Sequence, residues 1–273
     1  MEKETGKGRL ALITGSLGGL GSAFASLHAE RGGDLVLVDL DRERLEAQKR
    51  SLSSVYGVGV HTIAADLSSL TEVGKVHRAC TERGLMPDFL ILNAGFGGQG
   101  NFSNRSVEKD LSMLRVNAEA PTLLLKCFLP DFIKRGYGKV LLVSSLTAKM
   151  PGPLQAVYFA SKAYLTSLGN ALWRELKDTG VTCTTLMPGV LDTDFADKAH
   201  AQDTKLFAKR MPPMLAAERG YRGMLRGALN VTAAVPGLQK LLVPFLPILP
   251  RRLLLEVIYR MQQKESAVGW GKI

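Results

Sequence analysis

Cysteine and histidine are scarce in this sequence, and their placement argues against two kinds of site. The three cysteines, Cys80, Cys127 and Cys183, lie far apart and form no C-x-x-C pair. They indicate neither a disulfide framework nor a cysteine zinc site, so we expect a reducing, cytoplasmic environment. The four histidines lack the spacing of metal ligands, and we predict no metal site.

The sequence also lacks a long apolar segment. No apolar stretch before the first glycine cluster is long enough for a signal peptide. The longest charge-free apolar run toward the other end, LLVPFLPILP at residues 241–250, contains three prolines and is too short to span a bilayer. We therefore expect a cytoplasmic protein that is at most peripheral at a membrane.

Positive charge is concentrated in the last quarter of the chain. The formal net charge is +10, and residues 205–273 hold twelve Lys or Arg against three Asp or Glu. These basic residues are interleaved with Leu and Pro and not with a platform of stacking aromatic side chains. The pattern therefore does not favour nucleic acid as a partner.

Strand-like apolar runs alternate with longer amphipathic segments. Strands are predicted at residues 9–14, 34–39, 60–65, 88–92, 139–144, 181–187 and 230–235, and helices at 19–31, 41–54, 69–83, 106–135, 155–178 and 215–229. This alternation predicts an α/β fold with a Rossmann-like, doubly wound parallel sheet of about seven strands flanked by helices. We assign residues 8–235 to this single domain and residues 236–273 to an apolar, basic helical extension.

Glycine is abundant where the first predicted strand meets the first predicted helix. Residues 12–21 read LITGSLGGLG, although glycine inside a helix costs about 0.5–1 kcal/mol relative to alanine. Glycines at such a turn let a dinucleotide pyrophosphate approach the backbone and the helix N-terminus. The spacing Gly15-x-x-x-Gly19-x-Gly21 therefore favours nucleotide binding over a purely structural turn.

Asp39 ends the second predicted strand, eighteen residues after Gly21. A carboxylate at this position accepts hydrogen bonds from the adenosine ribose and repels a 2′-phosphate. NAD(H) is therefore the favoured cofactor. NADP(H) stays open because Arg42 and Arg44 follow closely, although we expect both on the exposed face of the next helix.

Tyr158 and Lys162 in YFASK are four residues apart and so share one side of a helix. A lysine ammonium beside a phenol lowers the pKa of the phenol, which makes it a better proton donor or acceptor near neutral pH. The alternative is an ordinary surface pair, and the motif alone does not decide between the two.

Five motifs together resemble the short-chain dehydrogenase/reductase family. They are TGSLGGLG, LNAG at 92–95, VSS at 143–145, YFASK, and PGVLDT at 188–193, in the order and at the spacing of the family over about residues 8–235. Each motif alone is ambiguous, but five in register are specific.

The resemblance implies a catalytic tetrad. Ser145 would hydrogen-bond the substrate oxygen, and Ser144 is its less well spaced competitor. Tyr158 would be the general acid/base, and Lys162 would bind the nicotinamide ribose and keep the pKa of Tyr158 low. Asn117 would hold a proton-relay water through a local helix irregularity, with Pro121 nearby.

The resemblance also implies a nicotinamide cofactor and the residues that would line its site. Asp66 would meet the adenine, and the segment from Pro188 to Thr193 would hold the nicotinamide end. The implied cofactor residues are Thr14, Gly15, Ser16, Leu17, Gly19, Leu20, Gly21, Asp39, Asp66, Leu67, Asn93, Ala94, Gly95, Tyr158, Lys162, Pro188, Gly189, Val190 and Thr193.

The predicted function is oxidation of a secondary alcohol, or reduction of a ketone or aldehyde, by hydride transfer. A second hypothesis is a cofactor-binding protein with a sensing or scaffolding role and little turnover. The resemblance implies a homodimer or homotetramer built through the helices at 106–135 and 155–178. The small-molecule substrate is expected to be lipophilic, because residues 194–214 offer Phe195, Phe207, Met211 and Met214; packing of this loop onto the domain is an equal alternative.

The C-terminal extension contains a basic amphipathic helix pattern. In LPRRLLLEVIYRMQQK the apolar residues Leu253, Leu254, Val257, Ile258 and Met261 follow helical spacing. Three interpretations remain open for this segment: packing on a neighbouring subunit, covering of the substrate pocket, and weak contact with an anionic membrane surface.

Overall fold

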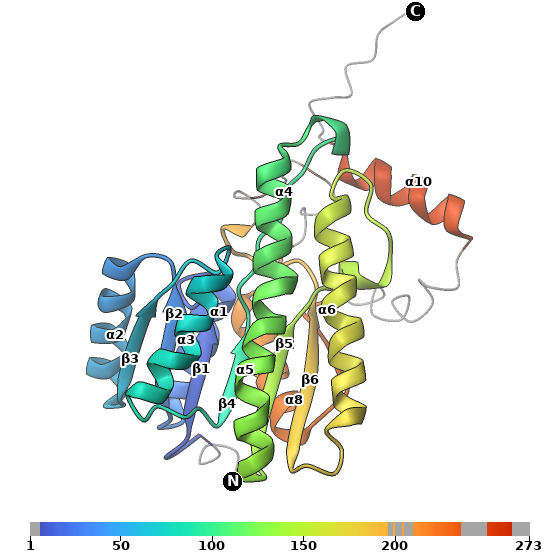
Figure 1. Cartoon of the computed structure of the whole chain (residues 1–273). Helices are drawn as coiled ribbons and strands as arrows, with labels where there is room; N and C mark the ends of the chain where they lie inside the picture. Colours follow the sequence, from blue (N-terminus) through green and yellow to red (C-terminus); the bar gives the residue numbers. More distant parts are fainter. Residues whose placement is uncertain (1–5, 196–198, 200–203, 205–209, 236–249, 264–273) are drawn as a thin grey trace, which may run out of the picture.

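A seven-stranded parallel sheet forms the centre of the protein in the computed structural model, which describes residues 6–195, 199, 204, 210–235 and 250–263 (Figure 1). The strands are β1 (Leu10–Thr14), β2 (Asp34–Asp39), β3 (Val60–Ala64), β4 (Phe89–Leu92), β5 (Gly138–Val143), β6 (Val181–Pro188) and β7 (Asn230–Ala233). Their order is β3-β2-β1-β4-β5-β6-β7, and every neighbouring pair is parallel. The predicted doubly wound fold is confirmed.

The strands are apolar on both sides because helices cover both faces of the sheet. Leu12 and Ile13 are adjacent in β1 and completely buried, yet they belong to two different core clusters, one on each face. Near-continuous apolar strands of this kind are typical of parallel sheets, and they explain why the strand positions were readable from the sequence.

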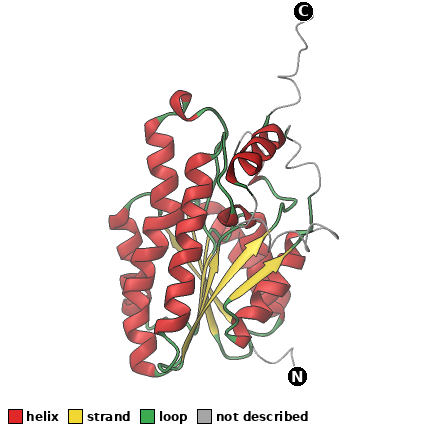
Figure 2. Cartoon of the chain, turned by 90° about the vertical axis from the view of Figure 1, so that its right-hand side faces the viewer, coloured by secondary structure: helices red, strands yellow, loops and turns green. Residues whose placement is uncertain are grey.

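Helices form an outer layer on each face of the sheet (Figure 2). Leucines and alanines of α1 (Gly19–Glu30), α2 (Arg42–Tyr56) and α8 (Pro213–Arg226) contribute to one core cluster. The other cluster includes residues of α3 (Leu70–Glu82), α5 (Ala120–Arg135) and α6 (Ala156–Glu175). Side-chain caps begin α2 and α3: Asp41 accepts a hydrogen bond from the backbone of Arg44, and Ser69 accepts one from Glu72.

The segment predicted as one helix at 106–135 consists of three parts. α4 (Val107–Leu114) passes into a π-helical turn at Arg115–Glu119, which continues as α5. The turn contains Asn117, and Pro121 lies in the first turn of α5, where proline is tolerated. The structure also has two short 3-10 helices that the sequence did not predict, at Phe102–Asn104 and Leu146–Lys149.

The last described helix, α10 (Arg251–Gln262), lies beyond the ends of the strands toward which their arrowheads point (Figures 1 and 2). Its Leu254 and Ile258 form a third apolar cluster with Met113, Tyr158 and Phe159. The extension is therefore packed against the main domain.

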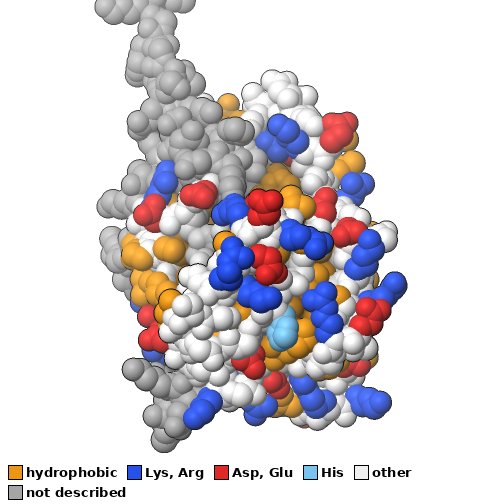
Figure 3. Space-filling model, turned by 90° about the vertical axis from the view of Figure 1, so that its left-hand side faces the viewer, with side chains coloured by type: hydrophobic (Ala, Val, Ile, Leu, Met, Phe, Trp, Pro, Cys, Tyr) orange, Lys and Arg blue, Asp and Glu red, His pale blue; other side chains and the backbone are white. Residues whose placement is uncertain are grey.

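The outer surface near α2 and α3 carries both signs of charge. Lys and Arg side chains alternate there with Asp and Glu, and no field of one sign dominates this face (Figure 3). Among the described residues, no helix has the length and apolar character needed to cross a membrane.

Candidate active site

A large cavity lies at the carboxyl ends of the strands, where the strand order changes direction between β1 and β4. Ligands of doubly wound sheets bind at this switch point. The cavity has a volume of about 1220 Å³ and extends from Asp39 at the end of β2, past the glycine turn and Tyr158, to the helix α10.

The glycine turn needs its bare backbone. Gly15 has φ of +65°, and a Cβ atom there would lie 2.8 Å from the Cα of Ala94. A Cβ atom on Gly21 would lie 2.0 Å from the carbonyl oxygen of Gly15. The backbone of Gly15 is therefore packed against Gly21 and against Ala94, just after β4. This packing leaves the N-terminus of α1 open to the cavity.

Hydrogen bonds fasten this turn to β4. The hydroxyl of Thr14 accepts hydrogen bonds from the backbone N–H groups of Asn93 (3.0 Å) and Ala94 (3.1 Å). The side-chain amide of Asn93 donates to the carbonyls of Thr14 and Gly15, both at 3.0 Å. Thr14 and Ser16 were predicted to line the cofactor site. Both are buried behind the cavity wall and do not line the cavity.

Asp39 forms the far end of the cavity. Its carboxylate accepts hydrogen bonds from the backbone N–H groups of Leu17 (2.9 Å) and Leu40 (2.8 Å). Asp66 and Leu67 line the same end. Arg42 and Arg44 are exposed, as expected. Arg44 also lines this end of the cavity, so the cavity wall there includes a cation as well as the Asp39 carboxylate.

Asn117 lies inside the π-helical turn and holds the loop after β4. Its side-chain oxygen accepts a hydrogen bond from the backbone N–H of Phe96 (3.0 Å), and its amide donates to the Phe96 carbonyl (2.9 Å) and to the Ser161 hydroxyl (3.0 Å). The residue is completely buried and does not line the cavity. Its side chain therefore positions the cavity wall that Phe96 forms.

The two candidate serines differ in their partners. The hydroxyl of Ser144 donates to the carbonyl of Lys162 (2.9 Å) and contacts the hydroxyl of Thr166 at 2.6 Å, so it ties β5 to α6. The hydroxyl of Ser145 is hydrogen-bonded to Tyr158, and it accepts a hydrogen bond from the backbone of Thr147 at 3.2 Å. Of the two, Ser145 is the one placed beside the phenol.

The pKa of Tyr158 is raised to about 12 because the phenol is buried, although its hydrogen bond to Ser145 acts in the opposite direction. The expected lowering of this pKa by Lys162 is wrong for the protein alone. The Lys162 ammonium donates to the carbonyl of Val143 (2.9 Å) and lies 5.9 Å from the centre of the Tyr158 ring. Burial also lowers the pKa of Lys162, to about 8.

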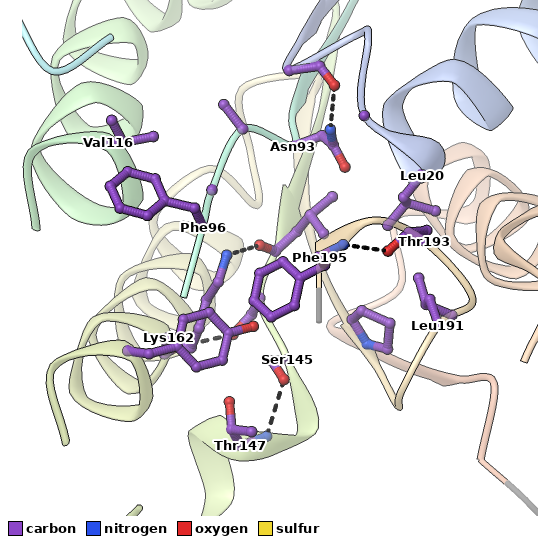
Figure 4. Close-up of a pocket in the computed structure, with 18 of the residues that line it drawn as sticks. Leu20, Asn93, Phe96, Val116, Ser145, Thr147, Lys162, Leu191, Thr193 and Phe195 are labelled. Atoms are coloured by element: carbon purple, nitrogen blue, oxygen red, sulfur yellow. Dashed lines mark hydrogen bonds between the residues drawn. The ribbon is translucent and has the colours of Figure 1, made fainter. Parts of the chain in front are cut away.

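The loop after β6 closes the cavity from the other side (Figure 4). Pro188, Gly189, Val190 and Thr193 all line it, as predicted for the far end of a dinucleotide site. Thr193 reaches the glycine turn so closely that a Cβ atom on Gly19 would lie 2.4 Å from its methyl group. The glycine turn and the loop after β6 therefore lie close together at this point.

Around Tyr158 the cavity wall is apolar. The ring of Phe195 lies 5.3 Å from the ring of Tyr158, and Figure 4 shows it close to Ser145 and Lys162. Sequence patterns had not assigned several further wall residues: Phe96, Ser112, Val116, Leu146, Thr147, Met150, Gln155, Phe159, Leu191, Asp194 and Val235. Phe159 and Leu191 belong to the motifs YFASK and PGVLDT, which carried no prediction for these two positions, and the others lie outside the five motifs. Phe195 was expected near the substrate, as part of the substrate loop.

The other apolar residues of the predicted substrate loop differ in where the structure places them. Met211 pairs with Leu191 through a backbone bridge and packs against the core, and Met214 is exposed. Phe207 lies outside the described residues, as do residues 196–198, 200–203, 205–209 and 236–249.

α10 covers the apolar end of the cavity. Leu254, Val257, Ile258 and Met261 line it, which is the pocket-covering interpretation of the extension. The buried side chain of Gln262 accepts a hydrogen bond from the Gln155 amide, and its carbonyl accepts one from the Gln99 amide. These contacts fix the end of α10 to the loop after β4 and to the N-terminus of α6, the helix that carries Tyr158.

The residues present fit a nicotinamide dinucleotide. The glycine cradle leaves no room for a Cβ atom, a carboxylate stands at the end of β2, and a continuous cavity joins them to Tyr158. A Cβ atom on Gly95 would come within 3.0 Å of the Lys162 ammonium, so the backbone there is also kept open. Among the described residues, no cluster of side chains could hold a metal ion.

The glycine turn, the Ser145–Tyr158–Lys162 arrangement and the parallel sheet define a dinucleotide-binding oxidoreductase fold. The model of the short chain dehydrogenase family matches residues 9–204, and the chain belongs to this family. The resemblance seen in the motifs is thereby confirmed.

Many proteins are similar to this chain, among them two relatives and one solved structure described below. Hydroxysteroid dehydrogenase-like protein 1 of Gallus gallus is 30% identical over 203 residues, which are 73% of this chain and 61% of that protein. The inactive hydroxysteroid dehydrogenase-like protein 1 of Homo sapiens is 29% identical over 66% of this chain and 55% of that protein. The chain thus spans between 55% and 61% of the length of these relatives.

The solved structure is a short-chain dehydrogenase from Sphingobium yanoikuyae in complex with NADPH. It superposes with a TM-score of 0.77, is 27% identical, and covers 82% of this chain and 87% of its own.

Proposed function

We propose that this protein interconverts a lipophilic secondary alcohol and the corresponding ketone or aldehyde, using a nicotinamide cofactor and Tyr158 as the general acid/base. The observation that carries the proposal is the meeting of Ser145, Tyr158 and Lys162 at the point where the glycine-lined part of the cavity meets its apolar part. A cofactor would occupy the first part and a substrate the second.

The chemistry divides between the cofactor and the chain. A nicotinamide cofactor, when bound, supplies or accepts the hydride. In reduction, the Tyr158 hydroxyl gives its proton to the carbonyl oxygen as the carbonyl carbon gains the hydride. In oxidation, the substrate hydroxyl returns that proton to Tyr158. Acid/base assistance of this kind contributes about 10²–10⁴-fold to the rate.

Three further residues support the proton transfer. The Ser145 hydroxyl would donate a hydrogen bond to the substrate oxygen and orient it toward Tyr158. The Lys162 ammonium places a positive charge near the phenol, where it would stabilise a developing phenolate. Asn117 keeps Phe96 in place on the cavity wall through two hydrogen bonds, and a third ties Asn117 to Ser161.

The pKa of Tyr158 bears on its role as the acid. A phenol with a pKa of about 12 holds its proton at pH 7, so Tyr158 has a proton to give to a carbonyl oxygen.

NAD(H) is the proposed cofactor because Asp39 stands where the adenosine ribose would bind. NADP(H) is the competitor, since Arg44 lines the same end of the cavity and the structurally similar Sphingobium enzyme was solved with NADPH. Asp39 and Arg44 therefore have opposite effects on the preference between NAD(H) and NADP(H).

Self-association through α4, α5 and α6 is part of the proposal. Leu111 of α4 is 46% exposed and Tyr164 of α6 is 45% exposed, and two long helices offer a surface for a homodimer or homotetramer. Size-exclusion chromatography with light scattering tests it, and a monomer at micromolar concentration would contradict it.

The decisive experiment measures turnover with NADH and NADPH against water-soluble lipophilic ketones, including bulky ring ketones. Tyr158→Phe should lower kcat about 10²–10⁴-fold and leave cofactor binding unchanged. Tyr164→Phe, on the exposed side of the same helix, is the matched control and should retain activity.

Cofactor binding without turnover on any ketone or alcohol would favour the second hypothesis, a cofactor-binding protein with a sensing or scaffolding role. The name of the human relative, which describes it as inactive, keeps this alternative relevant. Absence of cofactor binding would contradict both functions.

A further inference from the structure

α10 has an inner face that is fixed to the active site. Leu254 and Ile258 are buried on the cavity wall and pack with Tyr158 and Phe159. Gln262 is completely buried and bonds to Gln155. The helix is therefore a built part of the cavity and not a loosely attached tail, so whatever its outer face contacts lies next to the reaction centre.

Two residues of α10 belong to the cavity wall and to the outer surface at once. Val257 and Met261 line the cavity, yet they are 46% and 36% exposed. Their neighbours on the inner face, by contrast, are almost fully buried. The cavity therefore reaches the outside along an apolar edge formed by Val257 and Met261.

The remaining outer face of α10 combines exposed leucines with arginines. Leu253 is 60% exposed and Leu255 is 37% exposed. Arg251 and Arg252 precede them, and within the described part of the chain neither forms an ion pair. The only acid of the helix, Glu256, pairs with Arg260, whose Nε donates to it at 2.9 Å. The outer face is thus apolar and carries a net positive charge.

We propose that the outer face of α10 docks on an anionic phospholipid bilayer, so that the cavity opens at the membrane surface. Exposed leucines on a helix that lies in the bilayer interface bury apolar area among the lipid chains. Arginines beside them attract anionic headgroups, at about 1 kcal/mol for each residue near the surface. Both features lie beside the edge formed by Val257 and Met261.

The charge of the helix favours lipid over a second copy of the chain. A two-fold interface places the same patch on both sides, so two faces that each carry a net positive charge would meet. Like charges facing each other across an interface are unfavourable. An anionic lipid surface neutralises them.

The membrane contact deepens the proposed function by giving the source of the substrate. A lipophilic alcohol or ketone dissolved in the bilayer would enter the cavity past the edge formed by Val257 and Met261, without crossing water. This delivery step rests on the proposed function, whereas docking itself concerns only the surface of α10. The two are therefore measured separately.

Docking is tested by flotation of the full chain with vesicles of phosphatidylcholine, alone or with about 30% phosphatidylglycerol, at low and high salt. We expect recovery with the anionic vesicles at low salt and loss of recovery at high salt, where exposed charges are screened. Replacing both Arg251→Gln and Arg252→Gln should weaken binding about 30-fold. Leu253→Ser should weaken it several-fold.

Matched controls lie on the opposite side of the molecule. Val55 of α2 is 67% exposed, similar to Leu253, and Arg78 of α3 is exposed; Figure 1 shows both helices far from α10. Val55→Ser and Arg78→Gln should bind vesicles as the wild type does. Circular dichroism and cofactor titration of each variant separate weakened docking from loss of the fold.

Three outcomes would overturn the proposal. One is absence of recovery with anionic vesicles, and another is equal weakening by the α2 and α3 control variants. The third is a concentration-dependent dimer that Leu253→Ser dissociates, because it would assign the face to a second copy. Failure of the proposed function looks different: vesicles would still bind, but the protein would not turn over water-soluble ketones.

Discussion

The amide of Gln155, three residues before Tyr158, donates a hydrogen bond to the side chain of Gln262, which lies at the end of α10. Both side chains are buried. This contact joins the N-terminus of the helix that carries Tyr158 to the last described helix, across 107 residues of sequence. This polar contact adds to the apolar packing that holds α10 over the cavity.

Replacing Gln262 by leucine should loosen α10. Gln262→Leu keeps the volume but leaves the Gln155 amide as a buried donor without its acceptor, at a cost of about 1–3 kcal/mol. Because α10 lies at the surface and opens locally, amide hydrogen exchange within residues 254–262 should accelerate. Gln263→Leu, one residue later and half-buried, is the control. Equal exchange in all three proteins would contradict the role of the contact.

Asp39 and Arg44 should set the cofactor preference in opposite directions. Asp39→Ala removes the carboxylate at the ribose position and should weaken NADH binding about tenfold or more, while it relieves repulsion of the 2′-phosphate of NADPH. Arg44→Gln should weaken NADPH and leave NADH nearly unchanged. Fluorescence titration with both cofactors measures these effects. A wild-type preference for NADPH would show that Arg44 dominates.

Two glycine substitutions should have opposite effects on stability. A Cβ atom on Gly21 would lie 2.0 Å from the carbonyl oxygen of Gly15, so Gly21→Ala should lower the free energy of unfolding by about 1–3 kcal/mol and disturb cofactor binding. Gly74, inside α3, has no atom within 4 Å of such a Cβ, and Gly74→Ala should stabilise by about 0.5–1 kcal/mol. Urea unfolding compares them, and a neutral Gly21→Ala would refute the close packing of the turn.

Acid should destabilise the protein through His28. The ring of His28 is hydrogen-bonded to the Tyr221 hydroxyl (2.7 Å) and the Arg9 carbonyl (3.1 Å), and burial lowers its pKa from 6.5 to about 4. Between these two values the unfolded chain binds a proton that the folded protein does not. The free energy of unfolding should therefore fall by about 3 kcal/mol as the pH drops from 6.5 to 4.

Unfolding experiments along the pH scale test this contribution. His28→Gln should flatten the dependence between pH 6.5 and pH 4, because glutamine has no charge to gain. His61→Gln, at an exposed position of β3, should keep the wild-type slope. An unchanged slope in His28→Gln would mean that other groups carry the acid sensitivity.

The sequence by itself determined the sheet and much of the candidate site. Apolar runs such as LALIT and DLVLVD form β1 and β2 because both faces of a parallel strand are buried. The glycine spacing fixed the turn after β1, and the four-residue spacing of Tyr158 and Lys162 placed them on one side of α6. These features are local, so residue order alone specifies them.

Three properties depended on contacts between distant parts of the chain. The pKa of Tyr158 rises because residues from distant parts of the chain bury the phenol, an effect that the YFASK motif does not contain. Thr14 and Ser16 belong to the glycine motif, but the fold turns them away from the cavity and toward β4 and the core. Arg44 in the first turn of α2 is exposed, as expected, but the fold also places it on the cavity wall.

The place of the C-terminal helix is the largest contribution of the tertiary structure. Its amphipathic pattern was visible in the sequence, but that pattern left subunit packing, pocket covering and membrane contact open. Packing of Leu254 and Ile258 on Tyr158, together with the buried bond of Gln262, decided that its inner face covers the cavity. Periodicity shows that a helix has an apolar face, and only the folded chain shows which surface that face meets.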